Sequence, residues 1–193
     1  MKALRDILWL SKLNMRFSTS FLALALAGCS HLGFPPSSPK HLTLFISPFC
    51  PIFQRSTQEM RPREFQAAMA LKDVGVTWRP VEIFGTECDR MATKLILCGR
   101  RTSDPSWVVE HLASTDIPLS SCTSATLEEL FESVGKASTE VLACVRTDGE
   151  SLLRTERELL MEQKINAVPY YSLNSGPVTY FSNLKTLAEQ ITE

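Results

Sequence analysis

The sequence predicts an α/β fold in which a long helical insertion interrupts a mixed β-sheet. Three observations predict it: two strand-like segments joined by helices, a block with only helical periodicity from about residue 86 to residue 166, and a hairpin pattern followed by a last helix. Strands joined by helices run parallel and a hairpin is antiparallel, so the sheet is mixed. The chain has 193 residues, 44% hydrophobic and 21% charged, the composition of one ordinary globular domain.

The first part of the predicted sheet comes from two apolar segments with helices between them. The expected elements are, in order, a strand over residues 42–46, a helix to about Met60, a helix beginning at Pro62 and a strand over residues 77–84. Pro80 lies within the second strand. Because proline cannot donate a hydrogen bond to a neighbouring strand, Pro80 indicates an edge strand or a start at Val81.

The helical block contains two helix starts that can be identified from the sequence. Asp104 and Pro105 form an N-cap and first-turn pair. Thr126 and Glu129 have the spacing of a capping box. The remaining helices of this part are expected over residues 141–145 and about 150–164.

The last part of the chain has a hairpin pattern. Strand residues 169–173, a turn over residues 174–176 and strand residues 178–181 follow one another. An amphipathic helix over residues 184–191 closes the chain.

The charge and the motif content exclude several function classes. A net charge of −1 leaves no basic face to neutralise phosphates, so nucleic acid is not an expected partner. No cysteine or histidine spacing suits zinc, and no glycine-rich phosphate loop is present, so we expect no metal and no cofactor. Six cysteines are many for a reducing cytosol and favour an oxidising compartment.

The N-terminal segment has the pattern of a secretory signal peptide. Basic residues precede the apolar run 21–27, which is too short to span a bilayer because a spanning helix needs roughly 20 apolar residues. The ending Leu-Ala-Gly-Cys29 resembles the bacterial lipobox, which implies that Cys29 carries lipid such as palmitate and becomes the first residue of the mature protein. Met15 lies just ahead of Arg16, so the true start is Met1 or Met15.

This pattern predicts how the chain is organised. We expect a signal peptide over residues 1–28, a Pro/Ser-rich tether over residues 29–40, and one domain over residues 41–193 with its helical insertion at about 86–166. The lipobox resemblance, with Ser30 after the cysteine, implies a lipid-anchored protein of the bacterial cell envelope. In a Gram-negative cell it implies the outer membrane, with the domain facing the periplasm.

Cys50 and Pro169 are the candidate catalytic residues. Cys50 lies between a strand and a helix, where unpaired N–H groups and the helix dipole stabilise a thiolate. Pro51 fits the first helical turn, because its missing N–H costs nothing there. Val168-Pro169 precedes a strand and is a candidate cis peptide bond. Such a bond would turn the backbone of Val168 outward, as an edge with which an extended peptide can pair.

Two segments resemble a known family. The sequence LTLFISPFCPIF, residues 42–53, is similar to the strand and active-site loop of the thioredoxin superfamily, and INAVPYYSLNSG, residues 165–176, resembles its cis-proline strand and hairpin. The helical block between them resembles the DsbA branch, the thiol–disulfide oxidoreductases of the bacterial envelope. The resemblance implies a thioredoxin-like fold with a DsbA-like helical insertion, with Cys50 as the nucleophile and Pro169 as the cis-proline.

Phe53 departs from the Cys-Pro-x-Cys motif of that family. The second sulfur of the motif releases the bound substrate, and with Phe53 in its place that step is lost. Cys50 can still attack a substrate disulfide, and the intermediate then needs another thiol. We expect Val168, Pro169 and Phe53 to contact the substrate, a protein or peptide thiol or disulfide of the envelope.

The other cysteines of the domain are candidates for structural disulfides. In some members of the DsbA branch a second disulfide ties the insertion helices together, which implies a Cys98–Cys144 bond and leaves Cys88 with Cys122. The rival bond, Cys98–Cys122, resembles the staple of DsbC-type isomerases and leaves Cys88 with Cys144. An odd number of cysteines remains after the lipidated one, and Cys50 is the best candidate for the free thiol.

Three functions are compatible with these residues. The first is an envelope thiol–disulfide exchange protein, similar to an oxidoreductase or isomerase, which needs a free, exposed and easily ionised Cys50. The second is a non-catalytic thioredoxin-fold lipoprotein that binds an envelope partner or peptide and needs only the groove. The third is a glutathione-using transferase or isomerase, because Ser47-Pro-Phe49 resembles the active-site loop of the kappa-class transferases, which share the DsbA-like architecture.

Overall fold

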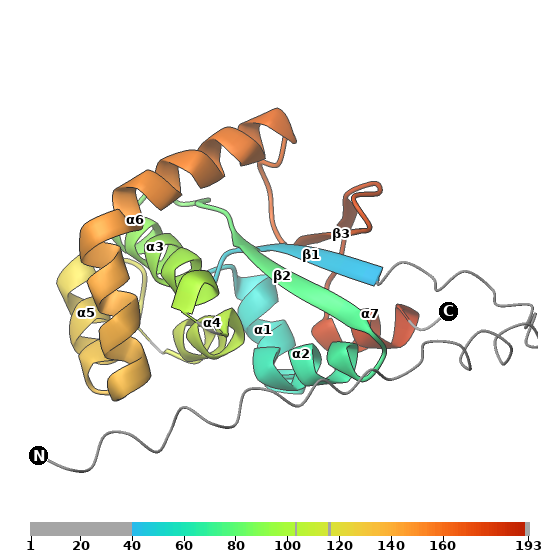
Figure 1. The fold of residues 1–193 in the computed structure, drawn as a ribbon, viewed down its shortest axis with the longest axis horizontal. Coiled ribbons are helices and arrows are strands. Elements are labelled where there is room, and N and C mark those ends of the chain that lie inside the picture. The colour runs from blue at the N-terminus through green and yellow to red at the C-terminus, as the bar shows by residue number, and fades with distance from the viewer. Residues whose placement is uncertain (1–39, 103, 116, 192–193) are drawn as a thin grey trace, which may run out of the picture. The chain divides into compact units, whose positions relative to one another are not determined.

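The structure is a computed structural model that describes residues 40–102, 104–115 and 117–191. The expected signal peptide, the expected lipidation site Cys29 and all of the tether except Lys40 lie outside the described residues. Figure 1 shows the strands and helices of the described part. Within it, no helix is both long and apolar enough to cross a membrane.

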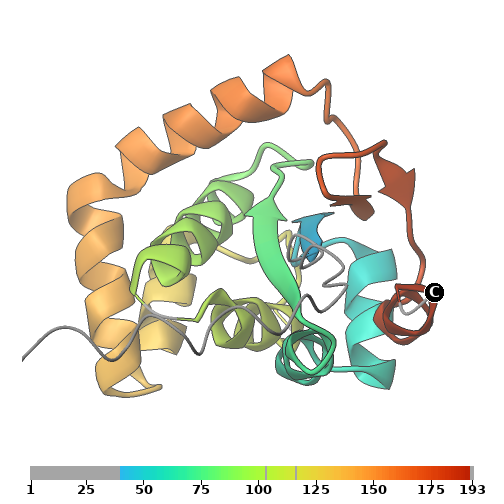
Figure 2. The ribbon, with the colours of Figure 1, turned by 45° about the vertical axis from the view of Figure 1, so that its right-hand side comes forward.

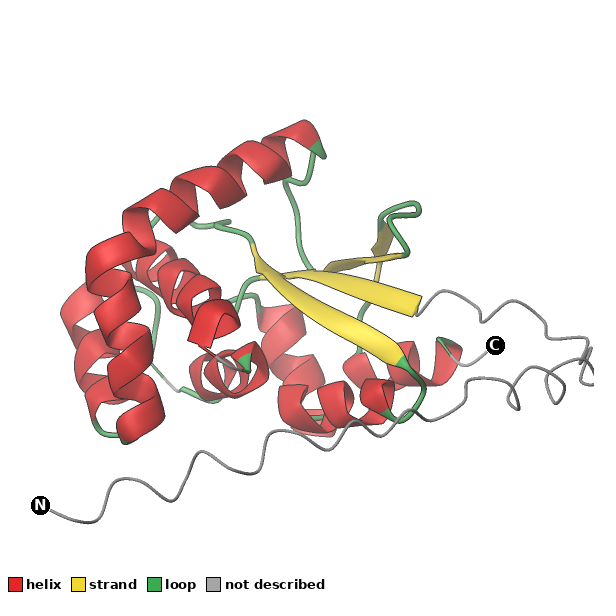
Figure 3. Cartoon of the chain, in the orientation of Figure 1, coloured by secondary structure: helices red, strands yellow, loops and turns green. Residues whose placement is uncertain are grey.

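In the described part, four strands form one mixed sheet, as predicted (Figure 3). They are β1 (Lys40–Ile46), β2 (Val74–Pro80), β3 (Tyr170–Leu173) and β4 (Thr179–Tyr180). The spatial order is β2-β1-β3-β4. β1 is parallel to β2 and antiparallel to β3, and β4 is antiparallel to β3. The hairpin and the parallel pair are therefore confirmed.

The second strand lies earlier in the chain than the sequence predicts. β2 begins at Val74 and ends at Pro80, so neither a strand over residues 77–84 nor a start at Val81 is correct. The Val81 N–H group donates to the Ile46 carbonyl at 2.8 Å, and β1 itself ends at Ile46. The chain therefore has no strand with which to pair beyond that point. β2 is an edge strand, as Pro80 indicated.

Three helices cover one face of the sheet. α1 (Pro51–Glu59) and α2 (Pro62–Ala70) connect β1 to β2, and α7 (Leu184–Gln190) follows the hairpin. Figures 1 and 2 show all three on the same side of the strands. A proline occupies the first turn of both α1 and α2, as predicted for both. The alternate residues of β1 are fully buried in one cluster with these helices: Leu42, Leu44 and Ile46.

Between β2 and β3, the described residues form four helices of the insertion: α3 (Glu87–Thr102), α4 (Pro105–Ala113), α5 (Ser124–Glu132) and α6 (Lys136–Glu162). Asp104 caps α4, as predicted, by accepting a hydrogen bond from the Ser106 N–H at 2.9 Å. The expected capping box at Thr126 is wrong. Thr123 is the N-cap of α5 and its hydroxyl accepts from the Thr126 N–H at 3.1 Å, so Thr126 already lies inside the first turn.

α6 is one helix of 27 residues where the sequence predicts two. Gly149, in the expected gap, is buried inside the helix, and a Cβ atom there would lie 3.2 Å from the Lys94 Cδ atom of α3. The glycine therefore allows α3 and α6 to approach each other and does not end a helix. Figures 1 and 3 show that α6 bends. Near its end, Leu160 packs with Phe45 and Val81 on the second face of the sheet.

Candidate functional site

Cys50 lies where β1 gives way to α1. The Cys50 N–H donates to the Ser47 carbonyl at 3.0 Å and closes the turn that follows the strand. Cys50 is the N-cap of α1, and Pro51 follows at the first helical position. Its side chain therefore lies at the positive end of the helix dipole, an environment that stabilises a thiolate.

Cys50 is a free thiol, but it is buried. Only 5% of its surface is exposed, and the adjacent Phe49 exposes 6%. The thiol-exchange hypothesis expects an exposed Cys50, and the structure contradicts that expectation. Because a disulfide must approach the attacking sulfur directly, groups around Cys50 have to move before the sulfur can react.

The Val168–Pro169 peptide bond is cis, and it lies at the same end of the sheet as Cys50. Phe45, near the end of β1, pairs with Tyr170 at the start of β3, so Pro169 lies beside the last residue of β1. Pro169 is buried and Val168 is partly buried. The structure thus brings the two candidate catalytic residues to one end of the sheet.

Phe53 lies in the core. Its side chain is fully buried, and its ring packs edge-on against the Trp78 ring of β2 with the centroids 6.4 Å apart. The prediction that Phe53 contacts a substrate is therefore wrong, because no part of the ring is exposed. Phe53 therefore joins α1 to the sheet.

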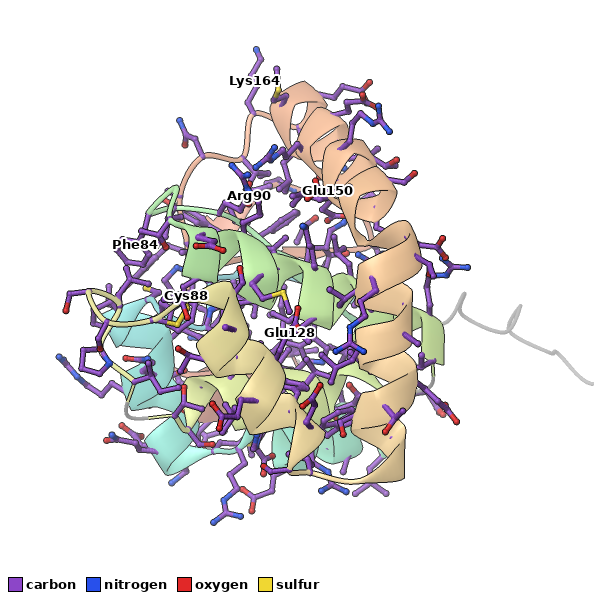
Figure 4. The ribbon with its side chains drawn as sticks, turned by 90° about the vertical axis from the view of Figure 1, so that its left-hand side faces the viewer. Phe84, Cys88, Arg90, Glu128, Glu150 and Lys164 are labelled. Atoms are coloured by element: carbon purple, nitrogen blue, oxygen red, sulfur yellow. A yellow bond between two sulfur atoms is a disulfide. The ribbon has the colours of Figure 1, made fainter. Side chains whose placement is uncertain are left out.

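In the described part of the chain, two disulfide bonds cross-link the insertion: one joins α3 to the loop before α5, and the other joins α3 to α6. Cys88 pairs with Cys122 and Cys98 pairs with Cys144, with Cα–Cα distances of 5.6 and 5.7 Å. This is the first of the two pairings considered, and it leaves Cys50 as the free cysteine among the described residues. Figure 4 shows Cys88 in the first turn of α3. Bonds that close loops of 34 and 46 residues stabilise a fold by about 3–4 kcal/mol each, which fits a structural role.

The first turn of α3 contains a buried carboxylate that the sequence analysis missed. Asp89 is fully buried, its Oδ2 atom accepts from the Phe84 N–H at 2.9 Å, and its own N–H donates to the Thr86 hydroxyl at 3.1 Å. Burial raises the pKa of Asp89, and the hydrogen bonds from the backbone of the preceding segment, first that of Phe84, oppose the shift. The spacing Thr86-x-x-Asp89 is that of a capping box and is the signal that could have found it.

The groups available for chemistry at this end of the sheet are a thiol, a helix N-terminus and a strand that begins with a cis-proline. Among the described residues, no cluster of three or more His, Cys, Asp or Glu side chains is arranged to hold a metal ion. A thiol at a helix N-terminus can attack a disulfide without a metal or an organic cofactor. Exchange between sulfur atoms is therefore the chemistry that the site can perform.

These features define the thioredoxin-like fold with a DsbA-like helical insertion, as the sequence predicts. Reduced DsbA1 from Neisseria meningitidis has a TM-score of 0.59 at 12% identity, over 82% of this chain and 88% of that chain. A thioredoxin-like oxidoreductase from Silicibacter pomeroyi has a TM-score of 0.58 at 14% identity, over 81% and 86% of the two chains. The catalytic domain of Proteus mirabilis ScsC has 0.57 at 18% identity, over 82% and 84%. No family model and no curated protein matches the sequence.

Proposed function

We propose that the protein is a thiol–disulfide exchange protein of the bacterial cell envelope that works with one nucleophilic sulfur, that of Cys50. One observation carries this proposal. Cys50 is the free cysteine of the described residues, and it lies at the N-terminus of α1, at the same end of the sheet as the cis Val168–Pro169 bond. Two of the similar structures are described as oxidoreductases, which supports the same general activity.

In the proposed reaction the Cys50 thiolate attacks one sulfur of a substrate disulfide. A bond forms between Cys50 and that sulfur, and the other substrate sulfur leaves as a thiolate, so no outside oxidant or reductant takes part in this step. The helix N-terminus stabilises the attacking thiolate before the reaction. The cis-proline presents the Val168 backbone, with which an extended substrate peptide can pair as an additional strand.

The mixed disulfide at Cys50 persists in this proposal. Phe53 occupies the position of a resolving cysteine, and the other four cysteines of the described residues are engaged in two disulfides. A thiol from another molecule must therefore complete the exchange. Accumulation of the mixed disulfide is the property that distinguishes this protein from one with two thiols in its motif.

A second candidate function is a non-catalytic module that binds an envelope partner or peptide at the same end of the sheet. The exposed fraction of Cys50, 5%, favours it, because a binding surface does not require access to the sulfur. The two functions differ in whether Cys50 reacts in the native protein.

The first test is alkylation of the native protein, read at the Cys50 peptide by mass spectrometry. For the exchange protein we expect iodoacetamide to modify Cys50 much faster than unfolding occurs, and a bulky maleimide to react at least tenfold more slowly because the sulfur is 5% exposed. Modification only at the rate of global unfolding would favour the binding module.

The second test compares three variants in a disulfide-exchange assay. Cys50→Ser should abolish formation of the mixed disulfide and leave the fold intact. Phe53→Cys adds a second thiol in the motif, so the mixed disulfide should no longer accumulate. Phe53→Ala is its matched control, because it removes the same buried ring, at a cost of about 3–5 kcal/mol, without adding a thiol. Equal accumulation in both Phe53 variants would contradict the proposal.

We also propose that residues 1–28 are a signal peptide, residues 29–40 a tether, and residues 41–193 the domain, with lipid on Cys29 and the protein in the outer membrane facing the periplasm. The basic segment, the short apolar run and the lipobox-like ending support this organisation. Labelling with a palmitate analogue in a Gram-negative host should mark the wild type and not Cys29→Ala. Label that persists in the variant would exclude lipidation at Cys29.

A further inference from the structure

The loop between α4 and α5 lies over part of the hydrophobic core. We call its residues 117–122 the strap. Ile117 and Leu119 are partly buried and pack against the core cluster that contains Cys50, while the two residues that follow Leu119 are exposed. The strap therefore covers apolar side chains of the core with a segment that forms neither a helix nor a strand.

The chain approaches the strap alongside α1. Glu110 of α4 accepts the Arg63 N–H at 3.3 Å, just beyond the C-terminal end of α1. Thr115, which follows α4, lines a polar groove together with residues of α1 as far back as Gln54. The Gln54 N–H donates to the Cys50 carbonyl at 2.9 Å, so Gln54 is one helical turn from the residue that carries the thiol. α4 therefore leads the chain along α1 towards the end at which Cys50 lies.

The strap ends beside α3, at the same end of the sheet. Cys122 is bonded to Cys88 in the first turn of α3 (Figure 4). α3 follows β2 after a short loop, and β2 ends at Pro80, which pairs with Ile46, the last residue of β1. Because Cys50 follows that same end of β1, both ends of the strap lie at the end of the sheet that carries the free thiol.

The strap has few attachments to the rest of the described chain. The Ser121 N–H and hydroxyl groups both donate to the Pro118 carbonyl, at 3.0 and 3.2 Å, inside the strap. Apart from Thr123, which is next in the chain, no other described residue exchanges a hydrogen bond or an ion pair with the strap. One disulfide and the packing of two apolar side chains hold it. Such a segment opens at a lower free energy than the core does.

The two disulfides of the insertion differ in what they hold. The Cys98–Cys144 bond joins α3 to α6, and these helices already pack against each other where Gly149 meets the Lys94 side chain. Breaking this bond therefore releases no segment. Breaking the Cys88–Cys122 bond frees one end of the strap. Cys122 is partly exposed and Cys88 is fully buried, so an external thiol has access at Cys122.

We propose that the Cys88–Cys122 disulfide is a second thiol–disulfide exchange site, which an external dithiol reduces, and that its reduction releases the strap and uncovers Cys50. This inference rests on the proposed exchange function and names the regulation of the same site. It accounts for a nucleophile that is only 5% exposed, because the oxidised protein keeps the strap over the end of the sheet. Bulky substrate disulfides reach Cys50 after reduction.

The opening reaction balances with a dithiol as the one co-reactant. A thiolate of the dithiol attacks the Cys122 sulfur, the bond between Cys122 and Cys88 breaks, and the Cys88 sulfur leaves as a thiolate that takes up a proton. The second thiolate of the dithiol then attacks its own sulfur in the mixed disulfide and releases Cys122. The dithiol is oxidised to a disulfide, and the two cysteines of the protein are reduced to thiols.

The first test removes each disulfide without a reductant in the purified full chain. Cys88→Ala combined with Cys122→Ala should raise the rate at which a bulky maleimide modifies Cys50 by about tenfold or more, because the strap is no longer tied to α3. Cys98→Ala combined with Cys144→Ala is the matched control. It removes a disulfide that closes a loop of 46 residues instead of 34, and it should change the rate by less than about twofold. Mass spectrometry of the Cys50 peptide gives the rates, and circular dichroism checks that both variants are folded.

The second test uses the wild type and does not depend on the folding of a variant. The protein is treated with increasing concentrations of dithiothreitol, which is removed in the absence of air before alkylation. Cys88–Cys122 should be reduced at lower concentrations than Cys98–Cys144, and the maleimide rate of Cys50 should rise with the first reduction. Hydrogen exchange of residues 117–122 should become faster at the same concentrations.

Failure of the inference and failure of the proposed function give different results. A bulky maleimide that modifies Cys50 equally fast in the wild type and in the folded variant without Cys88–Cys122 would overturn the inference and not the exchange function. Reduction of Cys98–Cys144 before Cys88–Cys122 would also overturn it. If iodoacetamide modifies Cys50 in neither the oxidised nor the reduced protein, the proposed function fails. Selective reduction of Cys88–Cys122 with faster hydrogen exchange of the strap would then still support the second exchange site.

Discussion

At the scale of single residues, Asp89 controls the backbone of the segment that leads from β2 to α3. Its fully buried carboxyl group accepts the Phe84 N–H, and burial raises its pKa above the model-compound value of 3.8. The folded protein therefore holds the carboxyl proton of Asp89 more tightly than the unfolded chain does. The contribution of the protonated Asp89 to the free energy of unfolding is complete below pH 3.8. It is lost as the pH rises through the raised pKa.

This pH dependence leads to a prediction for a variant of Asp89. Asp89→Asn mimics the neutral carboxyl group and cannot ionise. The free energy of unfolding of the wild type, relative to this variant, should therefore fall as the pH rises from about 4 and become constant above the raised pKa. Urea unfolding at a series of pH values, with the disulfides intact, measures the difference. A difference that grows with pH would show that the ionised form is the stabilised one.

Residue roles could be predicted from the sequence where they depend on neighbours in the chain. The Asp104 cap and the position of Cys50 at the start of α1 are of this kind, because turn and cap chemistry acts within a few residues. The burial of Cys50 and of Phe53 could not be predicted in this way. It depends on strands and helices far away in the sequence, such as the Trp78 ring that covers Phe53.

At the scale of elements, two glycines of the insertion show why one predicted helix break was absent. Gly149 faces the flexible Lys94 side chain, and Gly99 of α3 faces Val108 of α4, where a Cβ atom would lie 2.8 Å from the Val108 Cγ2 atom. Both glycines lie inside helices and mark close approaches between them. A glycine between two periodic segments predicts a break from sequence alone, because the partner helix is not visible there.

These glycines give opposite predictions for the same substitution. Gly149→Ala should stabilise the protein by about 0.5–1 kcal/mol, because alanine favours a helix and the Lys94 chain can move by the few tenths of an ångström required. Gly99→Ala should destabilise it by about 1–3 kcal/mol, because the β-branched Val108 is stiff and has little room to move. Urea unfolding of both variants measures the contrast. A gain in stability for Gly99→Ala would contradict the close packing of Gly99 against Val108.

At the scale of the whole described domain, one buried carboxylate joins the sheet to the insertion. Glu156 of α6 is 4% exposed and forms ion pairs with Arg79 of β2, at 2.9 Å, and with Arg100 of α3, at 3.3 Å. Three elements that are distant in the sequence therefore meet at one side chain. No local pattern predicts such a contact, although cap residues and helical periodicity predicted helices at α4, α5 and α6. Leu160, one turn further along α6, packs on the second face of the sheet, so this part of α6 lies against the sheet.

The prediction for Glu156 is a loss of stability much larger than that of a surface ion pair. Glu156→Ala leaves two partly buried guanidinium groups without their partner, and should lower the free energy of unfolding by about 3 kcal/mol. Glu128→Ala is the matched control, because Glu128 of α5 (Figure 4) forms a surface ion pair with the exposed Arg146 of α6, and its loss should cost less than about 1 kcal/mol. High salt should remove most of the Glu128 effect and little of the Glu156 effect, since buried pairs are screened less. Equal losses in the two variants at low salt would mean that Glu156 does not hold the insertion to the sheet.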